Sequence, residues 1–140
     1  MKPGDSFLLG ADLRKDPGVL HSAYNDSLGV TAAFNLNLLA RLNRELGANF
    51  PLELFEHRAF YDTKEHRIEM HLVALQDFTV VIPEAGTFPF TKGESVRTEL
   101  SHKYDRSTIH EILHSSGMEL VDWITAEPAD FALVVARRGR

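Results

Sequence analysis

The pattern of apolar and polar positions changes its period along the chain, and each period predicts a different kind of element. A continuous apolar run from Ser6 to Asp12 is typical of a strand buried on both faces of a parallel sheet. The Asp16-Pro17 pair then favours a short helix that reaches about Tyr24. The strongest signal follows, because apolar residues recur at every fourth position and predict an amphipathic helix: Val30, Phe34, Leu38, Leu42 and Leu46.

After Gly47, which ends this helix, the period falls to two and predicts strands. Two alternating runs, 55–61 and 66–73, flank a four-residue turn, and further strands are expected over 78–82 and 93–104. Asp105 is the expected cap of a helix that Gly117 ends, and the runs 118–125 and 130–137 are the last two strands. This order predicts a single α/β domain over residues 1–140, with a β-rich insertion from about Phe55 to Lys103.

Composition and charge narrow the classes of function. The chain has 140 residues, with 15 basic and 20 acidic side chains, a formal net charge of −5 and no cysteine. The acidic balance argues against nucleic acid or a membrane surface as a partner, because proteins that bind these are basic. The absence of cysteine from the sequence excludes disulfides and thiolate chemistry. Together with the lack of a long apolar segment, it makes the cytoplasm the expected location.

Few of the polar side chains form a recognisable chemical constellation. His66, Glu69 and His71 suggest a metal site, but on a strand the two histidines point to opposite faces, so a solvated hairpin is the favoured interpretation. The sequence contains no nucleophile elbow, no P-loop and no Gly-x-Gly-x-x-Gly motif.

Glu99 and Ser101 form the one suggestive pair. Strict alternation on a strand puts both on one face with Lys103, about 7 Å apart, where a carboxylate and a hydroxyl can grip a planar ring with two nitrogens. A half-exposed strand explains the same alternation, and the residue pattern alone favours this simpler interpretation. In the same way, Tyr24 can be an amphipathic residue that closes a helix, and Met70 can be part of the core.

Five strings of the sequence carry a resemblance to a known family. They are Leu-Leu-Gly-Ala-Asp-Leu-Arg-Lys-Asp-Pro (8–17), Ala-Tyr-Asn-Asp with Gly-Val-Thr-Ala-Ala-Phe-Asn-Leu-Asn (23–37), Phe-Glu-His-Arg-Ala-Phe-Tyr (55–61), Arg-Ile-Glu-Met-His-Leu (67–72) and Thr-Glu-Leu-Ser-His-Lys-Tyr (98–104). In this order and spacing they resemble the S-adenosylmethionine-dependent histidine Nα-methyltransferases of ergothioneine biosynthesis, over essentially the whole chain.

The resemblance implies a Rossmann-like methyltransferase core and a substrate pocket with four matching residues here. Tyr24 matches a tyrosine that holds the carboxylate side of the substrate, and Met70 matches a methionine that lines the pocket. Glu99 and Ser101 match the glutamate and the serine that bind the imidazole ring. With the resemblance, the interpretation of Glu99 and Ser101 as part of a small-molecule pocket overtakes the simpler one.

The same resemblance places the family's glycine-rich cofactor loop and catalytic-side residues upstream of the matching region. The chain is therefore expected to be the C-terminal half of such an enzyme, truncated or completed by a second chain, and to bind a histidine-like small molecule. S-adenosylmethionine is implied by the family but is not expected to bind this chain alone. A non-catalytic module that kept the fold and lost the cofactor site remains the alternative, so enzymatic activity is left open.

An exposed edge along Phe7–Ala11 predicts association, as a homodimer or with the missing half.

Overall fold

A computed structural model describes residue 2 and residues 4–139, so that Met1, Pro3 and Arg140 lie outside the described part. The chain divides into two compact units. Unit 1 contains the N-terminal segment through Asp16, the short segment Thr63–His66, and the chain from His102 onward. Unit 2 contains Pro17–Asp62 and Arg67–Ser101. The expectation of a single domain over 1–140 stays a prediction.

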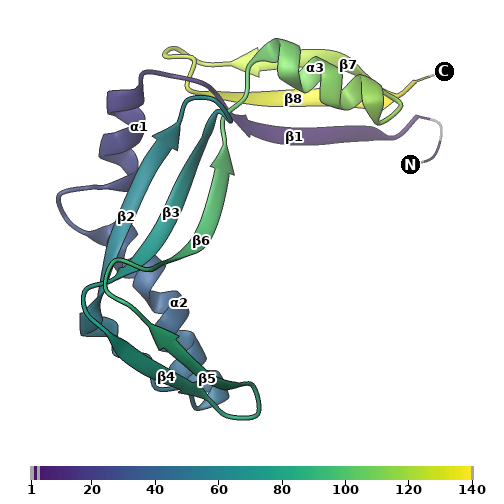
Figure 1. Cartoon of the computed structure of the whole chain (residues 1–140). Coiled ribbons are helices and arrows are strands. Elements are labelled where there is room, and N and C mark those ends of the chain that lie inside the picture. Colours follow the sequence, from purple (N-terminus) through teal and green to yellow (C-terminus); the bar gives the residue numbers. More distant parts are fainter. Residues whose placement is uncertain (1, 3, 140) are drawn as a thin grey trace. The chain divides into compact units, whose positions relative to one another are not determined.

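Unit 1 is a three-stranded sheet with one helix against it (Figure 1). Its elements are β1 (Ser6–Asp12), α3 (Arg106–Ser115), β7 (Met118–Thr125) and β8 (Phe131–Arg138). β8 lies between β1 and β7 and runs antiparallel to both. Ile109 and Leu113 of α3 pack on Ala132, Val134 and Ala136 of β8, which forms the core of this unit. Asp105 caps α3, as predicted, by accepting a hydrogen bond of 2.8 Å from the amide of Thr108.

β1 pairs with β8, the last strand of the chain. The prediction that β1 is buried on both faces is wrong, because most of its residues are exposed and Leu8 is 65% exposed. The apolar run was typical of a strand with helices on both sides, but α3 covers one face of this sheet only. Among the described residues β1 is also an edge strand, with no strand on the side away from β8.

Unit 2 is a second three-stranded sheet with two helices on one face and a separate hairpin (Figure 1). The sheet has the order β2 (Phe55–Asp62), β3 (Arg67–Ala74), β6 (Ser95–His102), and β2 and β3 pair in antiparallel register with the turn where the sequence predicts it. Leu20 of α1 (Pro17–Tyr24) packs on Ile68 and Met70, and Leu39 of α2 (Val30–Leu46) packs on Leu72. The two helices therefore cover the face of β3 that carries its even-numbered residues.

The hairpin of unit 2 contains a strand that the sequence analysis missed. β4 (Phe78–Ile82) was expected, but β5 (Gly86–Phe90) pairs with it across a turn in which Glu84 has a φ of 66°. Pro83 lies in the turn of this hairpin, and Gly86 begins β5, where it pairs with Ile82. β5 contains Pro89, and an edge strand tolerates proline. A short 3-10 helix, Leu52–Leu54, precedes β2.

The helix α2 has the predicted bounds, but most of its regular apolar stripe is exposed, and of its five residues Leu42 packs on the core. Val30 is 65% exposed and Phe34 is 66% exposed, while the residues buried against the sheet are Asn35 and Leu39. A fourfold repeat identifies an apolar side of a helix, and only tertiary packing decides whether that side is covered.

The Asp26 carboxylate accepts hydrogen bonds from the first two backbone amides of α2, those of Val30 and Thr31. These bonds, that from Thr31 first, lower the pKa of Asp26 to about 2.

Within the described part of the chain, no helix combines the length and the apolar character needed to cross a membrane.

Candidate functional site

Tyr24 and Ser101 meet directly, although 77 positions separate them in the sequence. Tyr24 is the last residue of α1, and Ser101 lies near the end of β6. The Tyr24 hydroxyl donates a hydrogen bond of 2.8 Å to the Ser101 Oγ. Both side chains are partly buried, so the two hydroxyls form a fixed polar pair at the end of the sheet.

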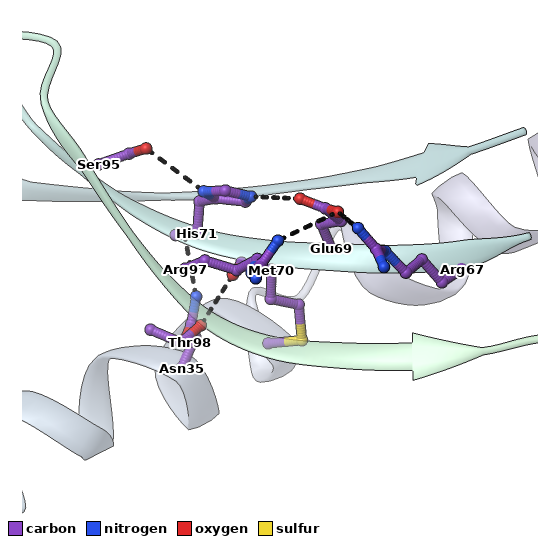
Figure 2. Close-up of polar contacts among 8 residues, drawn as sticks. All are labelled: Asn35, Arg67, Glu69, Met70, His71, Ser95, Arg97 and Thr98. Atoms are coloured by element: carbon purple, nitrogen blue, oxygen red, sulfur yellow. Dashed lines mark hydrogen bonds and ion pairs between the residues drawn. The ribbon is translucent and has the colours of Figure 1, made fainter. Parts of the chain in front are cut away.

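Met70 lies in the apolar cluster on which Tyr24 rests. Its side chain is 2% exposed and packs with Leu20, Ala59 and Ile68, and Tyr24 packs against the same cluster. The main-chain oxygen of Met70 accepts a hydrogen bond of 3.0 Å from the Thr98 hydroxyl, which ties β3 to β6 (Figure 2). The described structure thus brings three of the four candidate residues, Tyr24, Met70 and Ser101, to one region.

Glu99 lines a groove between α2 and β6. The groove has a volume of about 220 Å³, and it is lined by Phe34, Asn35, Asn37, Leu38, Arg41, Thr98 and Glu99. Glu99 is exposed, and its side chain makes no hydrogen bond or ion pair with any residue that the structure describes. Its carboxylate is therefore available to accept an N–H group from a ligand. Ser101 and Met70 are not among the residues that line this groove.

Side chains of β6 reach both faces of the sheet. Arg97 reaches the face of β3 that carries Glu69, with 3.6 Å between its Nη1 and Glu69 Oε1, whereas Ser101 reaches Tyr24 on the helix side. Glu99 lines the groove beside α2 and Ser101 bonds Tyr24 of α1, so both lie toward the helices, while the long Arg97 side chain reaches the opposite face from this edge strand. Lys103, expected beside Glu99 and Ser101, is instead buried in unit 1, where its ammonium donates to Asp12 at 2.7 Å.

Glu69 is not the solvated hairpin residue that the sequence suggested. Its side chain is only 9% exposed and lies in a polar cluster on the face of the sheet opposite the helices (Figure 2). Arg67 donates to Glu69 Oε1 through both Nε and Nη2, at 2.9 and 2.7 Å, and His71 Nε2 lies 3.1 Å from Oε2. The hydrogen bond with His71, followed by that from Arg67, lowers the pKa of the Glu69 carboxyl. The interpretation failed because alternation predicts which face a residue occupies and not what its neighbours on that face are.

The sequence analysis also missed a buried polar link between α2 and the sheet. Asn35 is 3% exposed, and its amide nitrogen lies 3.0 Å from His57 Nδ1 and 3.1 Å from the main-chain oxygen of His71. His57 Nε2 in turn lies 2.9 Å from the main-chain oxygen of Tyr24. A polar residue on the helix side that faces the sheet is the signal that could have found this link, since buried amides need partners.

Other histidines form no recognisable centre. His66 lies in the β2–β3 turn with a φ of 50°, and His71 is occupied by Glu69 and Ser95. His110 and His114 stack on each other along α3, with ring centroids 6.4 Å apart. In the described part of the chain, no group of three or more histidine, aspartate or glutamate side chains is arranged to hold a metal ion.

The turn after β1 does not fit a glycine-rich cofactor loop. Such loops need glycine where the backbone approaches the nucleotide, and residues 13–16 contain none. The basic side chains of this turn are also engaged, Arg14 with Asp105 and Lys15 with Asp12 at 2.9 Å. The turn after β1 therefore lacks the features of a glycine-rich cofactor loop.

Unit 2 by itself contains a groove, an exposed carboxylate beside it and a pair of hydrogen-bonded hydroxyls. Comparison with known proteins is more specific. The family model described as "Histidine-specific methyltransferase, SAM-dependent" matches residues 1–138, so the chain belongs to this family.

Named relatives agree with this assignment. A histidine N-alpha-methyltransferase of Mycolicibacterium smegmatis is 44% identical over 139 residues, and one of Mycobacterium tuberculosis is 42% identical over 139 residues. Each alignment covers 99% of this chain and 43% of the relative, so the chain spans less than half the length of these proteins. An ergothioneine biosynthesis protein 1 of Neurospora crassa is 28% identical over 127 residues, 86% of this chain and 14% of that protein.

Proposed function

We propose that this chain forms the substrate-binding portion of a SAM-dependent methyltransferase that acts on the amino group of histidine or a related amine. The hydrogen bond between Tyr24 and Ser101 is the observation that carries the proposal. These two residues match the family's substrate-binding tyrosine and serine, and the fold joins them from distant parts of the sequence.

In this proposal the chain positions the substrate. Glu99 accepts an N–H of the imidazole ring, and the Ser101 hydroxyl bonds the other ring nitrogen, as acceptor or donor. Tyr24 orients the Ser101 hydroxyl and holds the carboxylate side of the substrate. Met70 belongs to the apolar cluster against which Tyr24 packs. Methyl transfer to an amine depends on alignment of the reacting atoms, so holding the amine in one orientation is a catalytic contribution in itself.

The finer fold that we propose is the C-terminal half of a Rossmann-like core. Its support lies in unit 1, where β1 and β7 are both antiparallel to β8 and hence parallel to each other, and α3 precedes β7. Parallel strands joined through helices are the basis of doubly wound folds. The open edge of β1 is where such a sheet would continue.

We further propose that S-adenosylmethionine is bound by the region of these methyltransferases that lies outside the residues aligned with this chain. The relatives extend over more than twice the aligned length, which leaves room for a cofactor-binding half. Either such a half, as a complementing chain, or a second copy of this chain would cover the open edge of β1.

Binding of L-histidine followed by NMR tests the proposal on the chain itself. We expect histidine to shift the signals of Tyr24, and Glu99→Gln to weaken binding by about 1.5–3 kcal/mol, the value of a hydrogen bond to a charged group. Glu56→Gln is the matched control, because Glu56 is an exposed strand carboxylate away from the groove. Absence of binding at millimolar histidine, or equal effects of the two variants, would contradict the proposal.

The second candidate is a binding or interaction module without catalysis. The glycine-free, ion-paired turn after β1 favours it for the chain acting alone. Both candidates predict that the chain alone binds S-adenosylmethionine poorly. They differ in the completed protein: only the first predicts methylation of histidine when a cofactor-binding half is added to the chain, and a non-catalytic module would restore no activity.

A further inference from the structure

A single buried amide connects three elements of unit 2 behind the candidate site. Asn35 of α2 is 3% exposed, and its Nδ2 reaches both β2, at His57 Nδ1, and β3, at the main-chain oxygen of His71. A buried polar group with unsatisfied hydrogen bonds is costly, so this amide is held in one orientation by its partners. Figure 2 shows Asn35 beneath the strand that carries Met70 and His71.

The hydrogen-bond partners determine the orientation of the amide and the tautomer of His57 together. The main-chain oxygen of Tyr24 can only accept, so the His57 Nε2 that lies 2.9 Å away carries a hydrogen. The main-chain oxygen of His71 can also only accept, so the group of Asn35 that faces it is the NH₂. The same NH₂ then donates to His57 Nδ1, which must present its lone pair. Turning the amide over would oppose two oxygens, and a hydrogen on Nδ1 would oppose two donors.

These hydrogen bonds lead from Asn35 through His57 to Tyr24, a residue of the candidate site. His57 holds the last carbonyl of α1, at Tyr24, and the next residue is also fastened to β2, since Asn25 Nδ2 donates to the Ala59 oxygen at 3.1 Å. The C-terminus of α1 is thereby fixed on the sheet. From there the Tyr24 hydroxyl reaches Ser101.

We propose that Asn35 and His57 are positioning residues for the substrate site, because they fix the carbonyl of Tyr24 and so aim its hydroxyl at Ser101. This inference rests on the proposed function for the meaning of the site, but its geometry is independent of it. The Asn35 Nδ2 and both ring nitrogens of His57 already have partners within the protein, so the positioning role that we propose does not require these atoms to contact the substrate. The sequence pattern assigned them no role.

The tautomer of His57 is the first test, and it needs no substitution. Long-range ¹H–¹⁵N NMR of the wild-type chain at neutral pH should show a His57 ring with its hydrogen on Nε2 and an unprotonated Nδ1. A hydrogen on Nδ1, or rapid exchange between the two tautomers, would overturn the proposal.

Matched asparagines on α2 provide the second test. Asn43 also makes two short bonds, donating to the Phe50 oxygen at 2.8 Å and accepting from its amide at 2.7 Å, but it lies away from Tyr24. We expect Asn35→Ala to shift the ring signals of Tyr24, assigned by Tyr24→Phe, and Asn43→Ala to leave them in place. Equal shifts in both variants would mean a general loss of packing and would overturn the positioning role.

Conservative and disruptive changes of His57 complete the test. Glutamine offers an acceptor and a donor at the two ends of its amide, so His57→Gln should keep the wild-type Tyr24 signals, whereas His57→Phe should shift them. With L-histidine as the probe, Asn35→Ala should weaken binding about tenfold, the value of one misplaced hydrogen bond. If the wild-type chain binds no histidine, the proposed function fails, while the Tyr24 signals still decide the positioning role.

Discussion

The contact between Tyr24 and Ser101 can be tested by a double-mutant cycle. Tyr24→Phe removes only the hydroxyl that donates, and Ser101→Ala removes only the hydroxyl that accepts. Each residue has further interactions, so neither single variant measures the contact alone. The difference between the double variant and the sum of the single variants isolates the pair.

The expected coupling follows from the geometry of the bond. It joins two neutral hydroxyls at 2.8 Å in a partly buried site, and a net hydrogen bond of this kind contributes about 1 kcal/mol to the free energy of unfolding. Such a coupling is about a fivefold change in the unfolding equilibrium constant. A charged partner or full burial would raise this value, and full exposure would bring it close to zero.

Urea unfolding followed by circular dichroism measures the four free energies of the cycle. A parallel cycle with Tyr24→Phe and Glu99→Gln is the control, since no contact joins these two residues among the described interactions, and it should be additive. A coupling between Tyr24 and Ser101 within about 0.3 kcal/mol of zero, the usual error of additivity, would refute the reasoning that the fold brings this pair together.

Four further outcomes follow from the contacts described above. Lys103→Ala should lower the free energy of unfolding by about 2 kcal/mol or more through the loss of three buried methylenes, and Lys103→Met should cost less because the stem remains, both measured by urea unfolding. Asp105→Ala should cost about 1 kcal/mol in the same assay through loss of the α3 cap, whereas a change below the experimental error would mean that the cap is replaced by solvent. The pKa of Glu69 is held below its ordinary value of 4.5, so its carboxylate stabilises the fold above that pH, and this stabilisation is lost as the pH falls through the lower folded-state pKa. Glu69→Gln should therefore flatten the acid limb of a stability–pH curve, and an unchanged limb would contradict the cluster. Light scattering at micromolar concentration should show at least a dimer for the chain alone, and Leu8→Lys should shift it toward monomer or aggregate. A wild-type monomer with a sharp thermal transition would contradict the open edge of β1.

Local signals predicted most of the elements, because they depend on residues close in sequence. The bounds of α2 follow from the fourfold repeat and from Gly47, and the start of α3 follows from Asp105. The β2–β3 hairpin follows from two alternating runs around a polar turn. The candidate residues Tyr24, Met70, Glu99 and Ser101 came from the resemblance to a family, and the residue pattern alone favoured an ordinary core and surface for them.

Only the tertiary structure decided what each of these elements faces. The exposure of Val30 and Phe34, the burial of Glu69 and the pairing of Lys103 with Asp12 all depend on neighbours that are distant in sequence. Period and propensity describe one element at a time, whereas burial and hydrogen bonding are properties of two elements in contact. For the same reason the sequence could name Tyr24 and Ser101 as candidates, but their hydrogen bond, and the Asn35–His57 link behind it, exist only because helix and sheet pack in one register.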